Sequence, residues 1–131
     1  MVMLKGWTAA VALLLVVAPG VGHAVTEANF AASTTGDIVE LCDPQSDSAL
    51  AHAAVNFCSG FAQGAVTVEM EHDAGSRSMK LFCLPTPPPT RNEALSEFVK
   101  WARASPDRMN YRSADGLIRF LGERFPCPTH H

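Results

Sequence analysis

The sequence predicts a small all-α domain of four helices, stabilised by two disulfides and preceded by a cleaved signal peptide. Three observations indicate this fold class. Apolar residues recur at three- and four-residue spacing in several segments, and almost no segment alternates as a strand does. The chain also holds 4 cysteines, an even number that suits two bridges. Helices joined by short loops and fastened by cysteine pairs account for all three.

The N-terminal segment has the pattern of a secretory signal peptide. Lys5 precedes an apolar run over residues 7–18, and the small residues Gly22 and Ala24 close the segment. We expect cleavage after Ala24, which gives a signal peptide over residues 1–24. An uncleaved membrane anchor usually needs about 20 apolar residues, and Pro19–Gly20 interrupts this run. No second long apolar segment follows, so no stable membrane insertion is expected after cleavage.

The expected mature chain, Val25 to His131, is long enough for one domain. Residues 25–33 are small, polar and aperiodic, which predicts a flexible N-terminal segment, and residues 34–131 form the predicted helical domain. Without Lys5, 9 basic residues face 13 acidic ones, which leaves a net charge of −4 with neutral histidines. The basic residues are scattered, so the sequence does not indicate nucleic-acid binding.

The cysteines all lie in the exported part, where an oxidising compartment favours disulfides over free thiols. Three pairings are possible, and the spacing alone does not choose among them. We favour Cys42 with Cys58 and Cys83 with Cys127. The second bond would close a loop that begins at the stiff segment FCLPTPPPT, residues 82–90, and would fix where that spacer starts.

The first two predicted helices follow residue 33. Thr34 caps TGDIVELC, which ends before Asp43. Ser46 or Ser48 opens a long central helix that frays near residues 73–76. Its predicted apolar face consists of Leu50, Ala53, Ala54, Phe57, Phe61, Gly64, Ala65 and Val68.

Gly60 and Gly64 lie one turn apart on the central helix. Each glycine costs a helix about 1 kcal/mol, so two of them indicate a packing role. We favour a tight internal helix crossing over a dimer contact, and on that reading Gly60→Leu would overpack the core.

The last two predicted helices follow the proline spacer. Thr90 and Glu93 form a capping box, and the helix they open ends at Ser105. A polar stretch, DRMNYR, then leads to Ser113 and Asp115, which are expected to cap the last helix. The predicted apolar faces are Ala94, Leu95, Phe98, Val99, Trp101 and Ala102 in the first and Leu117, Ile118, Leu121 and Phe125 in the second.

The order of these motifs resembles a known family. The chain reads LC, then FCSGFAQG in a long helix, then FCLP, then a helix ending before SPDR, and finally RFPCP. Over about residues 34–128 this order resembles the Tai and Rap immunity proteins. These are small periplasmic proteins of Gram-negative bacteria that neutralise peptidoglycan amidases delivered by type VI secretion. All four cysteines stand in the expected neighbourhoods.

The resemblance implies an all-helical, disulfide-bridged periplasmic protein, often a homodimer, that plugs the active site of a protein effector. It does not imply which effector is bound. The residues shared with the family each have a scaffold explanation, so we expect none of them to be inhibitory. They are Cys42, Phe57, Cys58, Gly60, Gly64, Phe82, Cys83, Pro85, Phe125 and Cys127.

Inhibition needs a protruding surface, which proteins usually build on loops held by a rigid frame. Two loops are candidates, and for each an ordinary solvated connection is an equally good interpretation. One covers residues 69–80 and the other residues 105–112, where arginine, methionine and tyrosine are types enriched at interfaces. The candidate partner-binding residues are Glu71, His72, Asp73, Arg77, Arg108, Met109 and Tyr111.

The sequence gives little support to an enzyme, and we expect no catalytic residue, cofactor or metal site. The cysteines fit bridges, and His52 and His72 would lie about 30 Å apart on a straight helix. Glu69, Glu71, His72 and Asp73 include adjacent and alternate helical residues, which do not face one another. A solvated acidic helix end is the favoured interpretation of that group.

One alternative comes from another functional class, a periplasmic chaperone or a carrier of apolar cargo. Small bridged helical proteins can hold apolar ligands between their helices, and 47% of this chain is hydrophobic. Part of that share belongs to the predicted signal peptide, however, and the mature helices are amphipathic. A self-filled core is therefore the favoured expectation, while a carrier would show a ligand-dependent rise in melting temperature.

Overall fold

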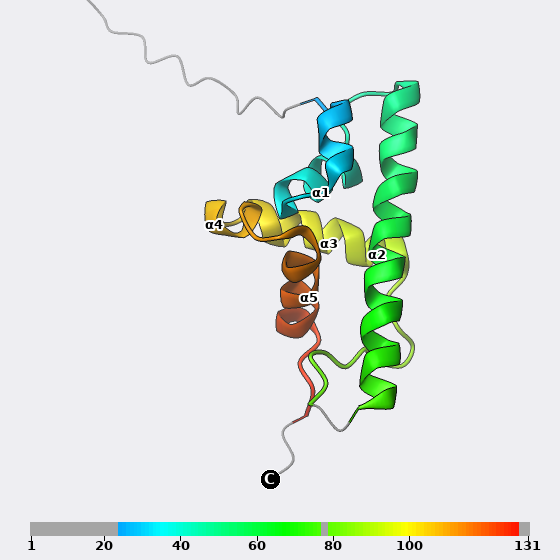
Figure 1. The fold of residues 1–131 in the computed structure, drawn as a ribbon, viewed down its shortest axis with the longest axis vertical. Coiled ribbons are helices and arrows are strands. Elements are labelled where there is room, and N and C mark those ends of the chain that lie inside the picture. Colours follow the sequence, from blue (N-terminus) through cyan, green and yellow to red (C-terminus); the bar gives the residue numbers. More distant parts are fainter. Residues whose placement is uncertain (1–23, 77–78, 129–131) are drawn as a thin grey trace, which may run out of the picture.

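The computed structural model describes residues 24–76 and 79–128 and is built from helices (Figure 1). In chain order these are the 3₁₀ helix η1 (Glu27–Ala31) and the α-helices α1 (Thr35–Cys42), α2 (Ala49–Gly75), α3 (Arg91–Arg103), α4 (Pro106–Met109) and α5 (Ser113–Arg124). Within the described residues no strand accompanies them, and a single isolated bridge pairs Thr34 with Arg112. The predicted all-α class is confirmed. The predicted signal peptide lies outside the described residues, apart from Ala24.

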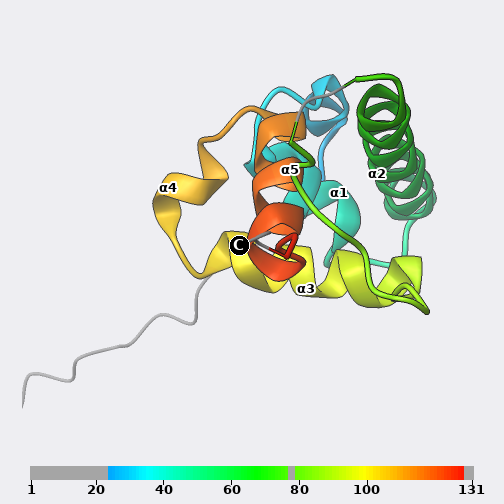
Figure 2. The same cartoon turned by 90° about the horizontal axis from the view of Figure 1, so that it is seen from below.

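Four of the helices are those that the sequence predicts, and α4 is an addition. Pro106 begins α4, where its fixed φ suits a first helical turn, but four residues are too few to show a period. Figures 1 and 2 place α4 on the side of the molecule away from α2. The stretch expected to be a polar surface connection is therefore partly helical.

Residues 25–33, expected to form a flexible segment, contain the short helix η1 in the structure. Thr26 and Asn29 form a reciprocal capping box around η1, and the Asn29 amide donates to Asp37 at 3.1 Å. Val25 is buried at 7% exposure, and the Phe30 ring meets the Phe57 ring edge-on at 5.4 Å between centroids. These contacts fasten the segment to α1 and α2.

The long helix α2 runs along the full height of the molecule (Figure 1). One narrow stripe of its side chains faces the core. The buried residues of that stripe are Ala51, Ala54, Cys58 and Ala62. The predicted apolar face is therefore only partly correct. Of its eight members only Ala54 is buried, while Ala53, Phe57, Gly64 and Val68 are exposed. Cys58 bonds to Cys42 of α1, which fixes the rotation of α2 about its axis.

The predicted tight helix crossing at Gly60 and Gly64 is wrong. Both glycines are exposed, and a Cβ atom built on either would have no heavy atom within 4 Å beyond its own helix. The expected overpacking in Gly60→Leu has no structural basis, because open space surrounds the position.

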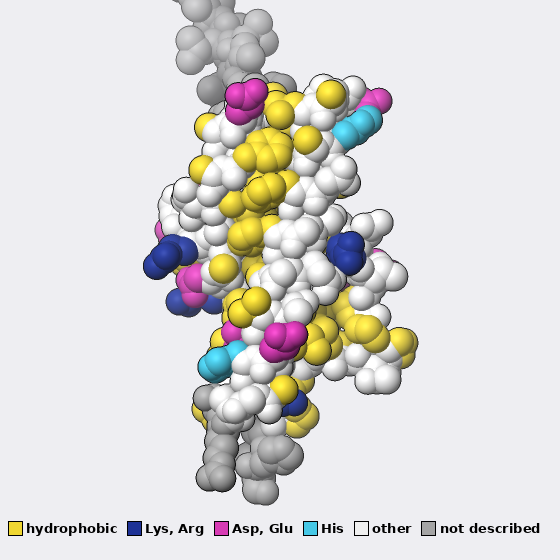
Figure 3. Space-filling model, turned by 45° about the vertical axis from the view of Figure 1, so that its right-hand side comes forward, with side chains coloured by type: hydrophobic (Ala, Val, Ile, Leu, Met, Phe, Trp, Pro, Cys, Tyr) yellow, Lys and Arg dark blue, Asp and Glu magenta, His cyan; other side chains and the backbone are white. Residues whose placement is uncertain are grey.

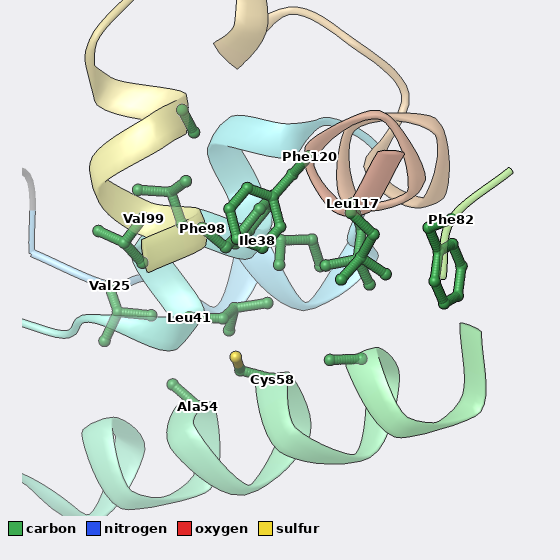
Figure 4. Packing of buried hydrophobic residues seen from close by; sticks show 14 residues of the cluster. Val25, Ile38, Leu41, Ala54, Cys58, Phe82, Phe98, Val99, Leu117 and Phe120 are labelled. Carbon is green, nitrogen blue, oxygen red and sulfur yellow. The ribbon is translucent and has the colours of Figure 1, made fainter. Parts of the chain in front are cut away.

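The short helix α1 lies at the centre of the fold and contacts every other helical element. Ile38, Val39 and Leu41 are completely buried in it, and Phe98 of α3 and Phe120 of α5 pack against them (Figure 4). By contrast, α2 and α3 make almost no direct contact with each other, although both pack on α1. The core therefore surrounds α1. The other two helices, α2 and α3, face each other across a seam with almost no direct contact.

The helix boundaries follow local capping chemistry in most places. Thr34 accepts a hydrogen bond from the Asp37 amide to begin α1, and Thr90 with Glu93 forms the predicted capping box of α3. The expected cap of α5 is wrong by one residue. Arg112 is the N-cap, without a side-chain hydrogen bond, and Ser113 is already helical and buried.

The favoured disulfide pairing is confirmed. Cys42 bonds to Cys58 and Cys83 bonds to Cys127, with Cα atoms 5.1 and 4.8 Å apart. The Cys83 amide also donates to the Phe125 carbonyl at 2.8 Å, which holds the start of the proline spacer against the end of α5. From that anchor the spacer leads to Thr90, where α3 begins.

The described helices include none that is long and apolar enough to cross a membrane.

Candidate partner-binding surface

The first predicted surface is the end of α2 rather than a loop, because the helix continues to Gly75. Glu71 and His72 are exposed and Asp73 is half-buried in its last two turns. Val66 is the last residue of α2 that packs against the core, so the helix continues for about 14 Å beyond its core-facing stripe. Arg77 was predicted as part of the same surface and lies outside the described residues.

The acidic groups at this end stand in an unfavourable position. The C-terminal end of a helix carries a partial negative charge, which repels carboxylates. Glu69, Glu71 and Asp73 nevertheless gather there, and none of them forms an ion pair with a described residue. A local conflict of this kind is expected where function opposes stability. A basic partner surface would relieve it.

Three groups at this end also approach one another closely. The ligand atoms of Glu69, His72 and Asp73 all lie within 4.8 Å of each other, since positions i, i+3 and i+4 share one helix face. The expectation that these residues cannot face one another therefore holds only for their adjacent and alternate pairs. One imidazole and two carboxylates could hold a divalent cation. Exposed acidic groups commonly converge without one, so this geometry alone assigns no metal site.

The second predicted surface is engaged by the scaffold. The Arg108 guanidinium donates to the Trp101 carbonyl at 2.8 Å and stacks over the Trp101 ring at 4.4 Å. Met109 is half-buried against the core, and the Tyr111 ring lies under Arg119 at 5.0 Å. These contacts give Arg108, Met109 and Tyr111 a structural task in holding α4 to α3 and α5.

A further surface runs along the outside of α2 and includes Phe57, Phe61 and Gly64 of the predicted apolar face. Hydrophobic side chains gather in a band over the upper part of this face of the molecule (Figure 3). We call it the α2 aromatic face, defined by Phe30, Phe57, Phe61, Gly60 and Gly64. The Phe57 ring stacks on the Phe61 ring at 6.5 Å and retains 36% exposure. The spacing of apolar residues in the sequence predicts an apolar face on this helix, but it does not predict that the face points outward.

Comparison with known proteins identifies the family. The sequence model of the Rap1a immunity proteins matches residues 34–127, which is most of the chain. The chain belongs to the Rap1a immunity protein family. No curated protein and no solved structure shows significant similarity to it.

The Rap1a match contains all four cysteines, the acidic end of α2 and the whole of α4. Membership of an immunity family gives the chain a protein toxin as its partner. The Rap1a scaffold explains the buried or bonded residues among those that carry the family resemblance. It does not explain Phe57, Gly60 and Gly64, which the structure leaves exposed on one face of α2. These three were predicted to be scaffold residues, and the structure makes them candidates for an interface.

Proposed function

We propose that this Rap1a protein acts in the periplasm, after cleavage behind Ala24, and blocks a peptidoglycan-cleaving amidase delivered by type VI secretion. The observation that carries the binding surface is the acidic end of α2, which continues beyond the buried stripe and has no ion pair among the described residues. A rigid helix loses little conformational entropy on binding, which favours high affinity.

Inhibition on this proposal is steric and electrostatic. The end of α2, with Glu71, His72 and Asp73, enters the substrate cleft of the amidase and excludes the peptidoglycan strand. The carboxylates face basic groups at the rim of the cleft, because complementary charge speeds encounter and fixes orientation. The returning chain at Lys80 and Phe82 lines a pocket together with Asp73, and the disulfide of Cys83 anchors that chain to Cys127.

The test uses residues 25–131 as bait in secreted and periplasmic extracts of the host bacterium. The captured enzyme is assayed on purified peptidoglycan while the immunity protein is added in rising amounts. We expect amide-bond cleavage to fall to background at an equal molar ratio. An amidase that stays active under a molar excess, or capture without any cell-wall hydrolase, would contradict the proposed function.

A variant pair tests the surface itself. Glu71→Lys with Asp73→Lys reverses the charge at the end of α2 and should weaken inhibition at least about ten-fold, the effect of losing close charge pairs. Folding should not suffer, since cations at a helix C-terminus are favourable. Asp47→Lys reverses one charge before the start of α2, where the exposed Asp47 pairs with the exposed His52, and should leave inhibition intact. Equal inhibition by the wild type, the double variant and the control would exclude the end of α2 as the inhibitory surface.

A second copy of the chain is the proposed occupant of the α2 aromatic face. Gly60 and Gly64 carry no side chains there, so another helix backbone could approach α2 closely beside the stacked rings of Phe57 and Phe61. This homodimer leaves the acidic end of α2 free, since that end lies beyond the face along the helix.

The alternative function, a chaperone or carrier of apolar cargo, would use space between the helices. Side chains fill the core around α1, which favours the immunity role. One pocket between α2 and α3 is apolar, and it is compatible with that role because it lies away from the end of α2.

A further inference from the structure

The seam between α2 and α3 holds an apolar pocket that is open to solvent on one side. Since the two helices barely touch, side chains from α2, α3, α5 and the proline spacer surround a space of about 280 Å³. Its apolar lining consists of Ala62, Val66, Leu84, Pro89, Ala94, Leu95, Leu117, Phe120, Leu121 and Phe125. The floor comes from core residues, of which Leu117, Phe120 and Leu121 are at most 4% exposed. The pocket is therefore rigid on its inner side.

The polar groups of the pocket are two side chains. The Arg91 guanidinium donates a hydrogen bond to the Gln63 amide oxygen at 3.0 Å, which links α3 to α2. Arg91 forms no ion pair with a described residue, and no carboxylate lines the pocket. Glu93 lies on the same helical turn, but its carboxylate accepts hydrogen bonds from Thr90. The site thus combines an apolar interior with one uncompensated positive charge.

We propose that this pocket binds a medium-length alkyl carboxylate, with the chain inside and the carboxylate on Arg91. An apolar cavity of about 150 Å³ accepts benzene, so 280 Å³ has room for roughly ten carbon atoms. A carboxylate can accept two hydrogen bonds from the planar guanidinium and would replace the neutral Gln63 amide there. The ligand site does not depend on the toxin, because none of its residues belongs to the acidic end of α2.

A chain-length series tests the apolar part of the site. Hexanoate, octanoate, decanoate and dodecanoate are titrated into the purified protein below their micelle concentrations and followed by calorimetry. We expect the affinity to rise about four-fold for each methylene group until the pocket is full, at about ten carbons, and then to level off. Absence of binding, or affinity that rises without a plateau as in surface adsorption, would overturn the proposal.

Matched ligands and variants test the charge. Octanol and octylammonium should bind more weakly than octanoate to the wild-type protein. Arg91→Gln should lower the octanoate affinity about ten-fold and leave octanol unaffected. Arg112→Gln is the control, because Arg112 is also exposed, lacks an ion pair with a described residue and lies outside this pocket.

Val66→Phe should exclude decanoate without unfolding the protein. Octanoate affinity that is unchanged in Arg91→Gln, or decanoate affinity that is unchanged in Val66→Phe, would refute the assigned site.

Discussion

Asp37 is the residue that joins the N-terminal segment to the core. Its carboxylate accepts hydrogen bonds from the Asn29 amide, the Ser33 and Thr34 backbone amides and the Thr34 hydroxyl, at 2.9 to 3.1 Å. Partial burial raises the pKa of Asp37, but these hydrogen bonds together outweigh it and hold the pKa below its ordinary value. The charged form is therefore the one that the fold stabilises.

Asp37→Asn should destabilise the protein by about 2 kcal/mol at pH 7, since an amide offers fewer acceptor positions to these donors. A folded-state pKa below the unfolded value adds stability that is present above about pH 4 and is lost as the pH falls through the folded pKa. The stability gap between wild type and variant should therefore narrow in acid. Urea unfolding at pH 7 and pH 2.5 measures it, with the exposed Asp107→Asn as control. If the difference in unfolding free energy between the two proteins is the same at both pH values, the charge of Asp37 does not contribute to stability.

The glycines give a matched pair of opposite expectations. A Cβ atom at Gly116 would lie 1.9 Å from the Thr35 Oγ1 atom, and Thr35 is fully buried and β-branched, so it cannot yield. Gly116→Ala should therefore cost about 3 kcal/mol. Gly60→Ala enters open space in a helix and should stabilise the monomer by about 1 kcal/mol. Thermal melting at low protein concentration measures the stability of both variants. Equal changes in melting temperature would contradict the close packing at Gly116 or the open space at Gly60.

At the scale of elements, the rotation of α2 shows what sequence periodicity can and cannot supply. Spacing correctly predicts the helix and its apolar content, but the apolar residues spread over more than the core stripe. The inward face is the one that carries Cys58, which bonds to Cys42 of α1, and the small residues Ala54 and Ala62 are buried on that face. Phe57 is larger than any of them and still lies outside, so size and hydrophobicity alone mislead.

Removing each disulfide should weaken the fold by a different amount. The chain-entropy model gives about 4 kcal/mol for the Cys83–Cys127 bond, with a sequence separation of 44, and about 3 kcal/mol for the Cys42–Cys58 bond, with 16. Paired serine variants, in which both partners are replaced, avoid a leftover thiol. Denaturant unfolding of the two double variants measures the losses. An undiminished free energy of unfolding in the Cys83 pair would contradict the role of that bond as an anchor for the spacer.

For the whole molecule, the helical class and most helix starts follow from the sequence, because caps and spacing are local. The cysteine spacing leaves three pairings open, and the structure confirms the favoured one. The seam between α2 and α3 could not be predicted from the sequence, because it arises only from the packing of both helices on the short α1. The same limit applies to the surfaces. Arginine is a residue type enriched at interfaces, yet Arg108 donates a hydrogen bond to the Trp101 carbonyl and pairs with Glu123, so it holds the scaffold together.

Self-association is the prediction at this scale. Phe57→Asp places a charge in the middle of the α2 aromatic face and should shift the protein from dimer to monomer in sedimentation velocity experiments. The monomer should also lose some stability, because Phe57 is only 36% exposed and its ring packs against Phe30 and Phe61, so circular dichroism must show that the variant is still folded. Met79→Asp is the control, since Met79 is 90% exposed and lies away from that face. A wild-type protein that is monomeric at all concentrations would exclude the second copy as the occupant.

The bond between Cys83 and Cys127 makes the segment between them a covalent ring that contains α3, α4 and α5. A protease that cuts once inside this ring, for instance in the exposed proline spacer, opens it without releasing a fragment. The two cut ends stay tethered through the sulfurs, so their effective concentration remains high and the helices can pack again. Only a second cut or a reductant separates them. A nicked molecule should therefore keep its mass on a non-reducing gel and break into two pieces on a reducing one.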